Sequence, residues 1–237
     1  HSSLPVPDNA IYHIVNALAK LERSPFPFEL NHVTRVYFER MAKLEKGQRG
    51  ADIRAILGAT PSSAAIARLS EDPRFTATMR TTCVATRLAA GHANNALPQS
   101  ARAIVNCRIL PGHSPEEIQA GLARIFNDPQ IEIKRADPAP GKKPMAPATL
   151  RPDVFKALER ISDEMWRGAP VIPEMETGAS DSVYTMGAGL PSYGISGLAI
   201  DRDDVRAHGK DERIRISSFD TAVQFYYRFL KALCATE

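Results

Sequence analysis

A proline-rich segment over residues 136–150 divides this chain of 237 residues into two parts. No helical or strand periodicity continues through it, because proline lacks a backbone N–H and fixes its φ angle. We therefore expect a first domain over residues 1–136, a linker over 137–150 and a second segment over 151–237. The prolines of the linker are Pro138, Pro140, Pro144 and Pro147.

The first part alternates helical and strand patterns. Apolar residues recur at helical spacing over residues 8–22, where Asp8 can cap the first turn. Strands are predicted over 76–88, 101–110 and 130–134, and Ser114-Pro115-Glu116-Glu117 opens a helix between the last two. With one strand missing in front, this order is a ferredoxin-like βαββαβ unit. A helical insertion occupies about residues 24–72, with predicted helices over 33–44, 51–57 and 62–69.

The second part is organised around residues 174–214, where small residues, turn formers and candidate ligands are concentrated. Ser180 or Asp181 can cap a short helix, a buried strand is expected over 190–195, and a polar loop leads to His208. With a strand near Val171 and helices opening at Pro152 and Ser218, these elements make an αβαβα segment. It is too small to cover its own sheet, so we expect it to dock on parallel strands outside this chain.

Charge and cysteine content argue against several classes of protein. The net charge is only +3, and its 30 basic residues are interleaved with 27 acidic ones, which is not the footprint of a nucleic-acid-binding protein. No apolar run approaches the length of a membrane span. The cysteines are three in number and widely spaced, which argues against a disulfide framework and a structural zinc site. We expect Cys83, Cys107 and Cys234 to be buried as small hydrophobic residues.

Several motifs occur together in this chain. The second part contains ETGASD, GLPSYG and HGKDERI, and the first part contains HSSLPVPDNAI and AGHANNALPQSARAIVNCRILPG. In their order along the chain, these motifs resemble those of the M20 family of zinc-dependent carboxypeptidases, aminoacylases and deacylases. The resemblance implies an α/β protein in which a lid or dimerisation domain precedes the last part of a parallel-sheet di-zinc domain. It also implies a homodimer formed through the lid.

The resemblance makes His208 the one metal ligand in this chain, binding zinc through a neutral ring nitrogen, with Glu212 able to orient it. The alternative is that His208 is an exposed histidine after a polar loop and has no role. One ligand cannot hold zinc, because a site needs three or four. The family's other ligands and its general base match nothing here. We therefore expect a fragment that lacks an N-terminal catalytic half and is inactive by itself.

The resemblance also implies residues that contact a peptide or an N-acyl amino acid. His1 would donate a hydrogen bond to the oxyanion of the tetrahedral intermediate, often in the partner subunit's active site. Asn95, rather than Asn94, would reach the substrate, and Arg108 would bind a substrate carboxylate. Alternatively, the asparagines are turn residues and Arg108 forms a surface salt bridge. Free N–H groups near Thr177, Gly178 and Ser180 could hold an anion, or they could only begin a helix.

Three functions follow from these residues. The first is part of a di-zinc hydrolase that cleaves a peptide or N-acyl amide bond next to a free carboxylate. The second is a non-catalytic binding or dimerisation module, in which the lid helix and edge strand pair with another lid and His208 is idle. The third, nucleophilic catalysis by serine or cysteine, has little support, because the chain contains no GxSxG motif. Nothing in the sequence assigns a cellular compartment.

Overall fold

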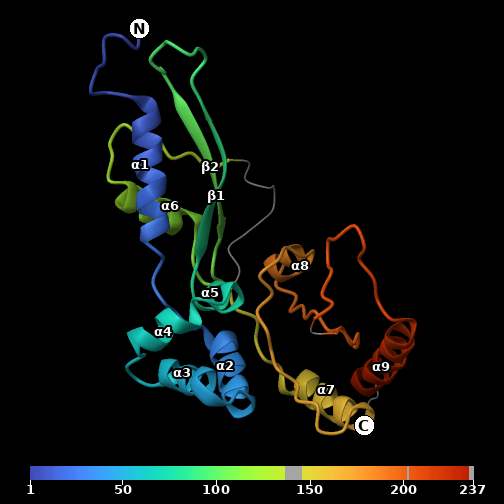
Figure 1. Cartoon of the computed structure of the whole chain (residues 1–237). Coiled ribbons are helices and arrows are strands. Elements are labelled where there is room, and N and C mark those ends of the chain that lie inside the picture. The colour runs from blue at the N-terminus through green and yellow to red at the C-terminus, as the bar shows by residue number, and fades with distance from the viewer. Residues whose placement is uncertain (137–145, 202, 235–237) are drawn as a thin grey trace. The chain divides into compact units, whose positions relative to one another are not determined.

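The computed structural model describes residues 1–136, 146–201 and 203–234, so most of the predicted linker lies outside it. The chain forms two compact units, which we call unit one (His1–Pro147 with Glu174–Leu190) and unit two (Ala148–Pro173 with Pro191–Glu237). Figure 1 follows the elements in order: α1 Ala10–Arg23, α2 His32–Leu44, α3 Gly47–Leu57, α4 Ser63–Leu69, α5 Pro73–Met79, β1 Thr82–Ala90, β2 Ala101–Arg108, α6 Pro115–Phe126, α7 Pro152–Met165, α8 Ser182–Gly187 and α9 Ile216–Cys234.

The sheet of unit one is an antiparallel hairpin of β1 and β2. Exposure alternates along β2 as predicted, with Val105 and Cys107 on the inner face and Asn106 and Arg108 on the outer face. Helices α1 and α6 lie together along one side of this hairpin (Figure 1). Their apolar residues close the inner face, and the buried members of this core are Ala17, Leu21, Ile118, Leu122 and Phe126. The predicted α/β fold class is confirmed.

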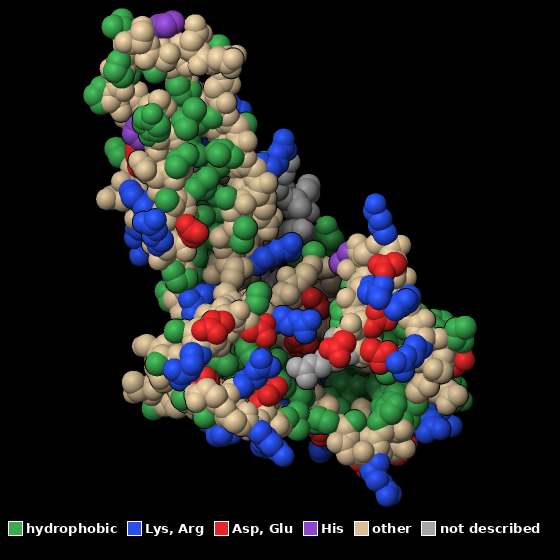
Figure 2. Space-filling view, in the orientation of Figure 1, with side chains coloured by type: hydrophobic (Ala, Val, Ile, Leu, Met, Phe, Trp, Pro, Cys, Tyr) green, Lys and Arg blue, Asp and Glu red, His purple; other side chains and the backbone are tan. Residues whose placement is uncertain are grey.

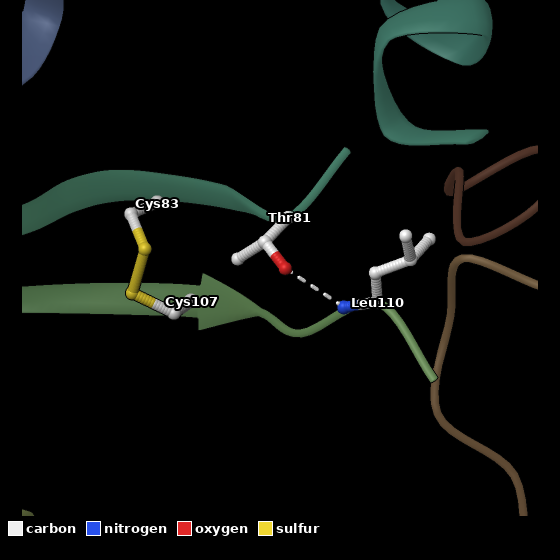
Figure 3. Close-up of a disulfide and its surroundings, with 4 residues drawn as sticks. All are labelled: Thr81, Cys83, Cys107 and Leu110. Atoms are coloured by element: carbon white, nitrogen blue, oxygen red, sulfur yellow. Dashed lines mark hydrogen bonds between the residues drawn. A yellow bond between two sulfur atoms is a disulfide. The ribbon is translucent and has the colours of Figure 1, made fainter. Parts of the chain in front are cut away.

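A disulfide joins Cys83 to Cys107, so the expectation of unpaired cysteines was wrong. The two residues are direct partners in the register of β1 and β2, and Figure 3 shows the bridge between the strands. Next to it, the buried Thr81 hydroxyl accepts a hydrogen bond from the Leu110 backbone N–H at 2.9 Å. Spacing along the chain did not reveal the pair, because pairing depends on cross-strand register. Cys234 is free but exposed, so its predicted burial was also wrong.

The three helices predicted in the insertion are seen as α2, α3 and α4, and a further helix that was not predicted, α5, follows the insertion directly. A strand was expected to begin at residue 76, within α5. Instead, Asp72 caps the helix by accepting a hydrogen bond from the Arg74 N–H at 2.9 Å, and Pro73 is its first residue. Phe75 and Met79 then enter the core around Phe38. Local capping and burial outweigh the strand preference of the threonines.

The predicted cap of α6 is confirmed, whereas the first turn of α1 is capped by a different residue from the one predicted. The predicted capping box of α6 is present, with Ser114 and Glu117 each accepting a hydrogen bond from the other's backbone N–H at 3.1 Å. Helix α1 is capped by Asn9 and not by Asp8, since Asn9 Oδ1 accepts from the Ile11 N–H at 2.9 Å. The carboxylate of Asp8 contacts the His13 ring instead, at 3.0 Å.

Three predicted strands are not strands in the described part of the chain, because an extended segment needs a neighbouring strand to pair with. Residues 130–134 pack Ile131 and Ile133 on the core of α1 and α6, but the Ile133 carbonyl accepts from the Gln119 side chain at 2.9 Å. The segments near Val171 and over 190–195 also form no strand. Tyr193 packs on the core of unit two and donates its hydroxyl proton to the Thr149 carbonyl at 2.6 Å.

Unit two is held together by α7 and α9, whose apolar faces meet as their helical spacing predicts. The buried residues at this contact are Val154, Ala157, Leu158, Ile161, Phe225 and Phe229. Helix α9 begins at Ile216, two residues before the predicted start, so Ser218 lies inside it. The Ser218 hydroxyl donates to the Ala199 carbonyl at 2.7 Å, which ties the preceding loop to the helix.

Charged side chains of both signs are interspersed on the face shown in Figure 2. A membrane-spanning length of apolar helix is not found in any of the helices that the structure describes.

Two histidines of unit one, each between two carboxylates, predict a pH-dependent stability. The His13 ring lies 2.5 Å from Asp128 and 3.0 Å from Asp8, and these hydrogen bonds, that of Asp128 foremost, raise the pKa of His13. His113 lies 2.8 Å from Glu29 and 3.1 Å from Glu117, and its pKa is raised chiefly by Glu29. A histidine pKa that is higher in the folded state stabilises fully below about pH 6.5, and this stabilisation is lost as pH rises through the folded pKa.

The same pairs also make stability fall at low pH. His13 lowers the pKa of Asp128, and the capping hydrogen bond from Ser114, followed by His113, lowers the pKa of Glu117. These carboxylates lose their contribution as pH falls through their folded pKa values. We expect the denaturant midpoint of unfolding to be highest near pH 6 and to fall toward pH 8.5. The difference should shrink when His13 and His113 are both replaced by glutamine, whereas His32→Gln, at an exposed position, should keep it. An unchanged difference in the double variant would contradict the prediction.

Candidate functional site

The structure brings two of the predicted site residues, His1 and Asn95, together at the tip of the β1–β2 hairpin. The Asn95 side-chain Nδ2 lies 3.2 Å from His1 Nε2, although the residues are 94 positions apart in the sequence. The Asn95 backbone carbonyl accepts a hydrogen bond from the Ser2 N–H at 2.9 Å, which ties the two segments a second time. Both side chains are exposed.

Ser3 holds the other side of the His1 ring. Its hydroxyl oxygen lies 2.8 Å from Nδ1, and its backbone N–H lies 3.2 Å from the same nitrogen. Because the Ser3 N–H donates to Nδ1, this nitrogen is the acceptor of the neutral ring, and the ring proton lies on Nε2, which faces the Asn95 side-chain amide. Ser3 was not selected from the sequence, and its position two residues after the histidine is the one signal that could have indicated it.

Arg108 stands at the other end of the hairpin. It ends β2 and is opposite Thr82, whereas the turn that carries Asn95 precedes Ala101. Seven strand steps of about 3.3 Å put its Cα roughly 23 Å from that of Ala101. The Arg108 side chain is exposed and forms no ion pair with a described residue, so the predicted alternative of a surface salt bridge has no support among the described residues.

The segment around Thr177, Gly178 and Ser180 is exposed and uses two of its N–H groups internally. The Gly178 N–H donates to the Glu176 carboxylate at 2.9 Å, and the Ser182 N–H donates to the Ser180 hydroxyl at 3.1 Å. Ser180, and not the side chain of Asp181, thus provides the hydrogen bond at the start of α8. A ligand oxygen at Gly178 would have to replace the Glu176 carboxylate.

His208 lies in a sharp turn in the loop before α9. Its φ angle of 64° is in the left-handed region, and the Gly209 N–H donates to the Arg206 carbonyl at 2.9 Å. The ring is exposed and makes no hydrogen bond with a described residue. The Glu212 side chain is also exposed and makes no hydrogen bond with a described residue. The predicted contact between this carboxylate and His208 is therefore not seen within the described ranges.

In this loop, charged side chains from the residues before His208 contact charged side chains from the residues after it. Asp204 accepts from Arg213 and from Arg206, and Arg206 also reaches Asp211. The arginines, Arg206 first, lower the pKa of the Asp204 carboxyl, which is therefore ionised over the physiological range. Alternating acids and bases over residues 201–215 were the available sequence signal for this set.

The donors in the described residues fit one ligand of a metal site and not a complete site. No group of three or more His, Cys, Asp or Glu side chains that could hold a metal ion is found in residues 1–136, 146–201 and 203–234. An exposed imidazole in a sharply turned loop suits a single ligand, and a zinc site needs two or three further protein ligands. Such ligands would have to come from outside the described residues.

Comparison with known proteins identifies the family. Residues 1–134, more than half of the chain, match the family model described as the M20 peptidase dimerisation domain. The chain belongs to the M20 peptidase family. The resemblance noted in the sequence is thereby confirmed, and the α1, β1, β2 and α6 layer lies within the M20 dimerisation domain.

Individual relatives agree with this assignment. A probable carboxypeptidase S-like 2 from Dictyostelium discoideum is 26% identical over 236 residues, covering 98% of this chain and 44% of the relative. The human N-fatty-acyl-amino acid synthase/hydrolase PM20D1 is 26% identical over 240 residues, covering 98% and 46%. The crystal structure of the M20 family metallo-carboxypeptidase Sso-CP2 from Sulfolobus solfataricus shares the fold, with a TM-score of 0.55 and 16% identity over 96% of this chain and 53% of that one. The chain thus spans about half the length of these relatives.

Proposed function

We propose that this M20 chain forms the dimerisation domain and part of the metal site of a zinc-dependent hydrolase. The enzyme would act on an N-acyl amino acid or peptide, cleaving an amide bond next to a free carboxylate. Relatives named as carboxypeptidase-like proteins and N-fatty-acyl-amino acid hydrolases support this substrate class. The remaining ligands and the general base would come from an N-terminal catalytic half, without which we expect these residues to be inactive.

The contact between His1 and Asn95 carries this proposal. Two polar side chains that are remote in sequence meet at an exposed hairpin tip, where they contribute nothing to a core. Such a pair is expected where it contacts a ligand or another chain, since exposed polar contacts add little to stability.

The separation of His1 from Arg108 supports a site shared between two subunits. About 23 Å of strand divides the hairpin tip from Arg108, which is longer than an amino acid with a short acyl group. One hairpin therefore cannot place both side chains on the same reacting amide. In a homodimer through this domain, the His1 and Asn95 tip would reach the partner's site while Arg108 serves its own.

Each residue of this chain would have a defined task in that site. His208 would bind zinc through its neutral imidazole, and the Arg108 guanidinium would bind the substrate carboxylate through paired N–H donors. Zinc, when bound, polarises the scissile carbonyl and activates water. Thr177, Gly178 and Ser180 would contact a substrate oxygen once the Glu176 carboxylate moves from the Gly178 N–H.

His1 would stabilise negative charge on the carbonyl oxygen. With Nδ1 accepting the Ser3 N–H, the ring proton lies on Nε2, and this N–H beside Asn95 is the donor that would face the oxygen. A fixed donor at a developing oxyanion stabilises the transition state more than the ground state, because the charge appears only as the bond forms.

Arg108 provides the test of the substrate class. In the full-length protein, Arg108→Gln should lower kcat/KM for an N-acyl amino acid by about tenfold to hundredfold, since a charge-assisted hydrogen bond contributes about 1.5–3 kcal/mol. Most of the loss should appear in KM. The carboxamide analogue of the substrate should be a poor substrate for both proteins and should show little further loss.

Arg102→Gln is the matched control, because Arg102 is exposed on the same outer face of the same strand. It should leave kcat/KM for both substrates near the wild-type value. Equal losses for the two arginine variants, or equal activity of the wild-type protein on the free acid and the carboxamide, would overturn the proposed specificity.

A further inference from the structure

The loop that carries His208 is closed by ion pairs that join the chain before the histidine to the chain after it. Asp204 accepts from Arg213 Nε at 3.0 Å and from Arg213 Nη2 at 3.1 Å, and this pair spans nine residues. Arg206 contacts Asp204 on its own side and Asp211 on the other side of His208. His208 therefore lies inside three nested ion pairs, Arg206–Asp211, Asp204–Arg213 and Asp201–Arg215, and Asp204 and Arg206 connect the inner two.

Asp204 is the centre of this arrangement. Its carboxylate is the one group that contacts both Arg206 and Arg213, and its side chain is 30% exposed, against 59% for Arg213. Two carboxylate oxygens that accept from two N–H groups of one planar guanidinium form a bidentate contact. Such a contact fixes the relative orientation of the two side chains, which a single contact with a lysine ammonium would not. Because Arg206 is held at the same time, the carboxylate sets the distance between the two flanks of the loop.

The turn inside these links needs such support. A residue with a Cβ atom rarely adopts the left-handed conformation, and His208 does so with a φ of 64°. The turn is completed by the hydrogen bond from the Gly209 N–H to the Arg206 carbonyl, at 2.9 Å. Arg206 is thus both the acceptor of the turn and a partner of Asp204. Removing Asp204 would release the residue on which the turn is built.

We propose that Asp204 is the positioning residue for His208, fixing through Arg206 and Arg213 the turn that presents the imidazole to the metal. This inference rests on the proposed ligand role of His208. It assigns the orientation of His208 to Asp204, whereas Glu212 was the residue expected from the sequence. Asp204 acts on the conformation of the loop and does not touch metal or substrate.

The test is Asp204→Asn in the full-length protein, which keeps the shape of the side chain and removes its charge. Zinc affinity, measured by competition with a chromogenic chelator, should fall about tenfold to hundredfold, as for the loss of a group that orients a ligand. Amide hydrogen exchange over residues 207–212 should accelerate in the metal-free protein. Arg213→Lys, which keeps the charge but loses the fork, should shift both readouts in the same direction by less.

Asp203→Asn is the matched control, since Asp203 is exposed in the same loop and forms no ion pair with a described residue. It should leave both readouts unchanged, and unaltered exchange in α9 would show that the variants are folded. His208→Ala separates the two hypotheses. Zinc retained by His208→Ala would reject the ligand role itself. Zinc lost by His208→Ala but bound normally by Asp204→Asn, with unaltered loop exchange, would reject the positioning role alone.

Discussion

Replacement of His208 by alanine in the full-length protein is expected to weaken zinc binding by more than about 100-fold and to reduce turnover at least as much. Loss of a group that merely orients a metal ligand already costs about tenfold to hundredfold, so loss of the ligand itself must cost more. His208 is exposed and makes no hydrogen bond with a described residue, so the change should leave the thermal midpoint of unfolding of the metal-free protein almost unaltered.

This combination distinguishes a ligand from a structural residue. Metal content after gel filtration and kcat under saturating substrate are the two measurements, and thermal unfolding checks the fold. His32→Ala is the control, because His32 is an exposed histidine at the start of α2 and should keep both metal and activity. A His208→Ala protein with full metal content would favour the alternative of a dimerisation module in which this histidine is idle.

The helices were predictable from the sequence because their signals are local. The capping box at Ser114, proline at the start of α7 and the apolar spacing of α1 each lie within a few residues of the backbone groups they act on. Even the error at α1 was local, since Asn9 caps the helix next to the predicted Asp8. Helix α5 was not predicted, because its threonines favour a strand, whereas the Asp72 cap and Pro73 start a helix there.

The strands and the site depend on partners that spacing does not reveal. Residues 190–195 have the composition of a buried strand, but they form no strand among the described residues. His1 and Asn95 were singled out separately by resemblance, and their contact emerges only when the hairpin folds back on the first residues. Glu212 and Asp204 are both carboxylates and equally close to His208 in sequence, and only the observed ion pairs distinguish them.

Removing the disulfide should give the largest change in stability. For Cys83 and Cys107, which are 24 residues apart, the entropy that the cross-link removes from the unfolded chain corresponds to roughly 3.5 kcal/mol. Cys83→Ala combined with Cys107→Ala should lower the free energy of unfolding by about this amount. Reduction of the wild-type protein should have a similar effect, because two thiols still pack as small hydrophobic groups beneath α1 and α6.

Cys234→Ala controls for the loss of a thiol as such, since Cys234 is free and exposed, and it should leave the denaturant midpoint unchanged. Intact mass before and after reduction establishes whether the bond is present. An unreduced protein that is no more stable than the double variant would show that the unfolded hairpin is already restricted without the bond.

Because disulfides persist in oxidising compartments, blocking thiols in intact cells before lysis would also show whether the hairpin folds in such a compartment. Alkylation of both Cys83 and Cys107 under those conditions would mean that the folded protein normally carries a reduced hairpin, stabilised by the packing of α1 and α6 alone.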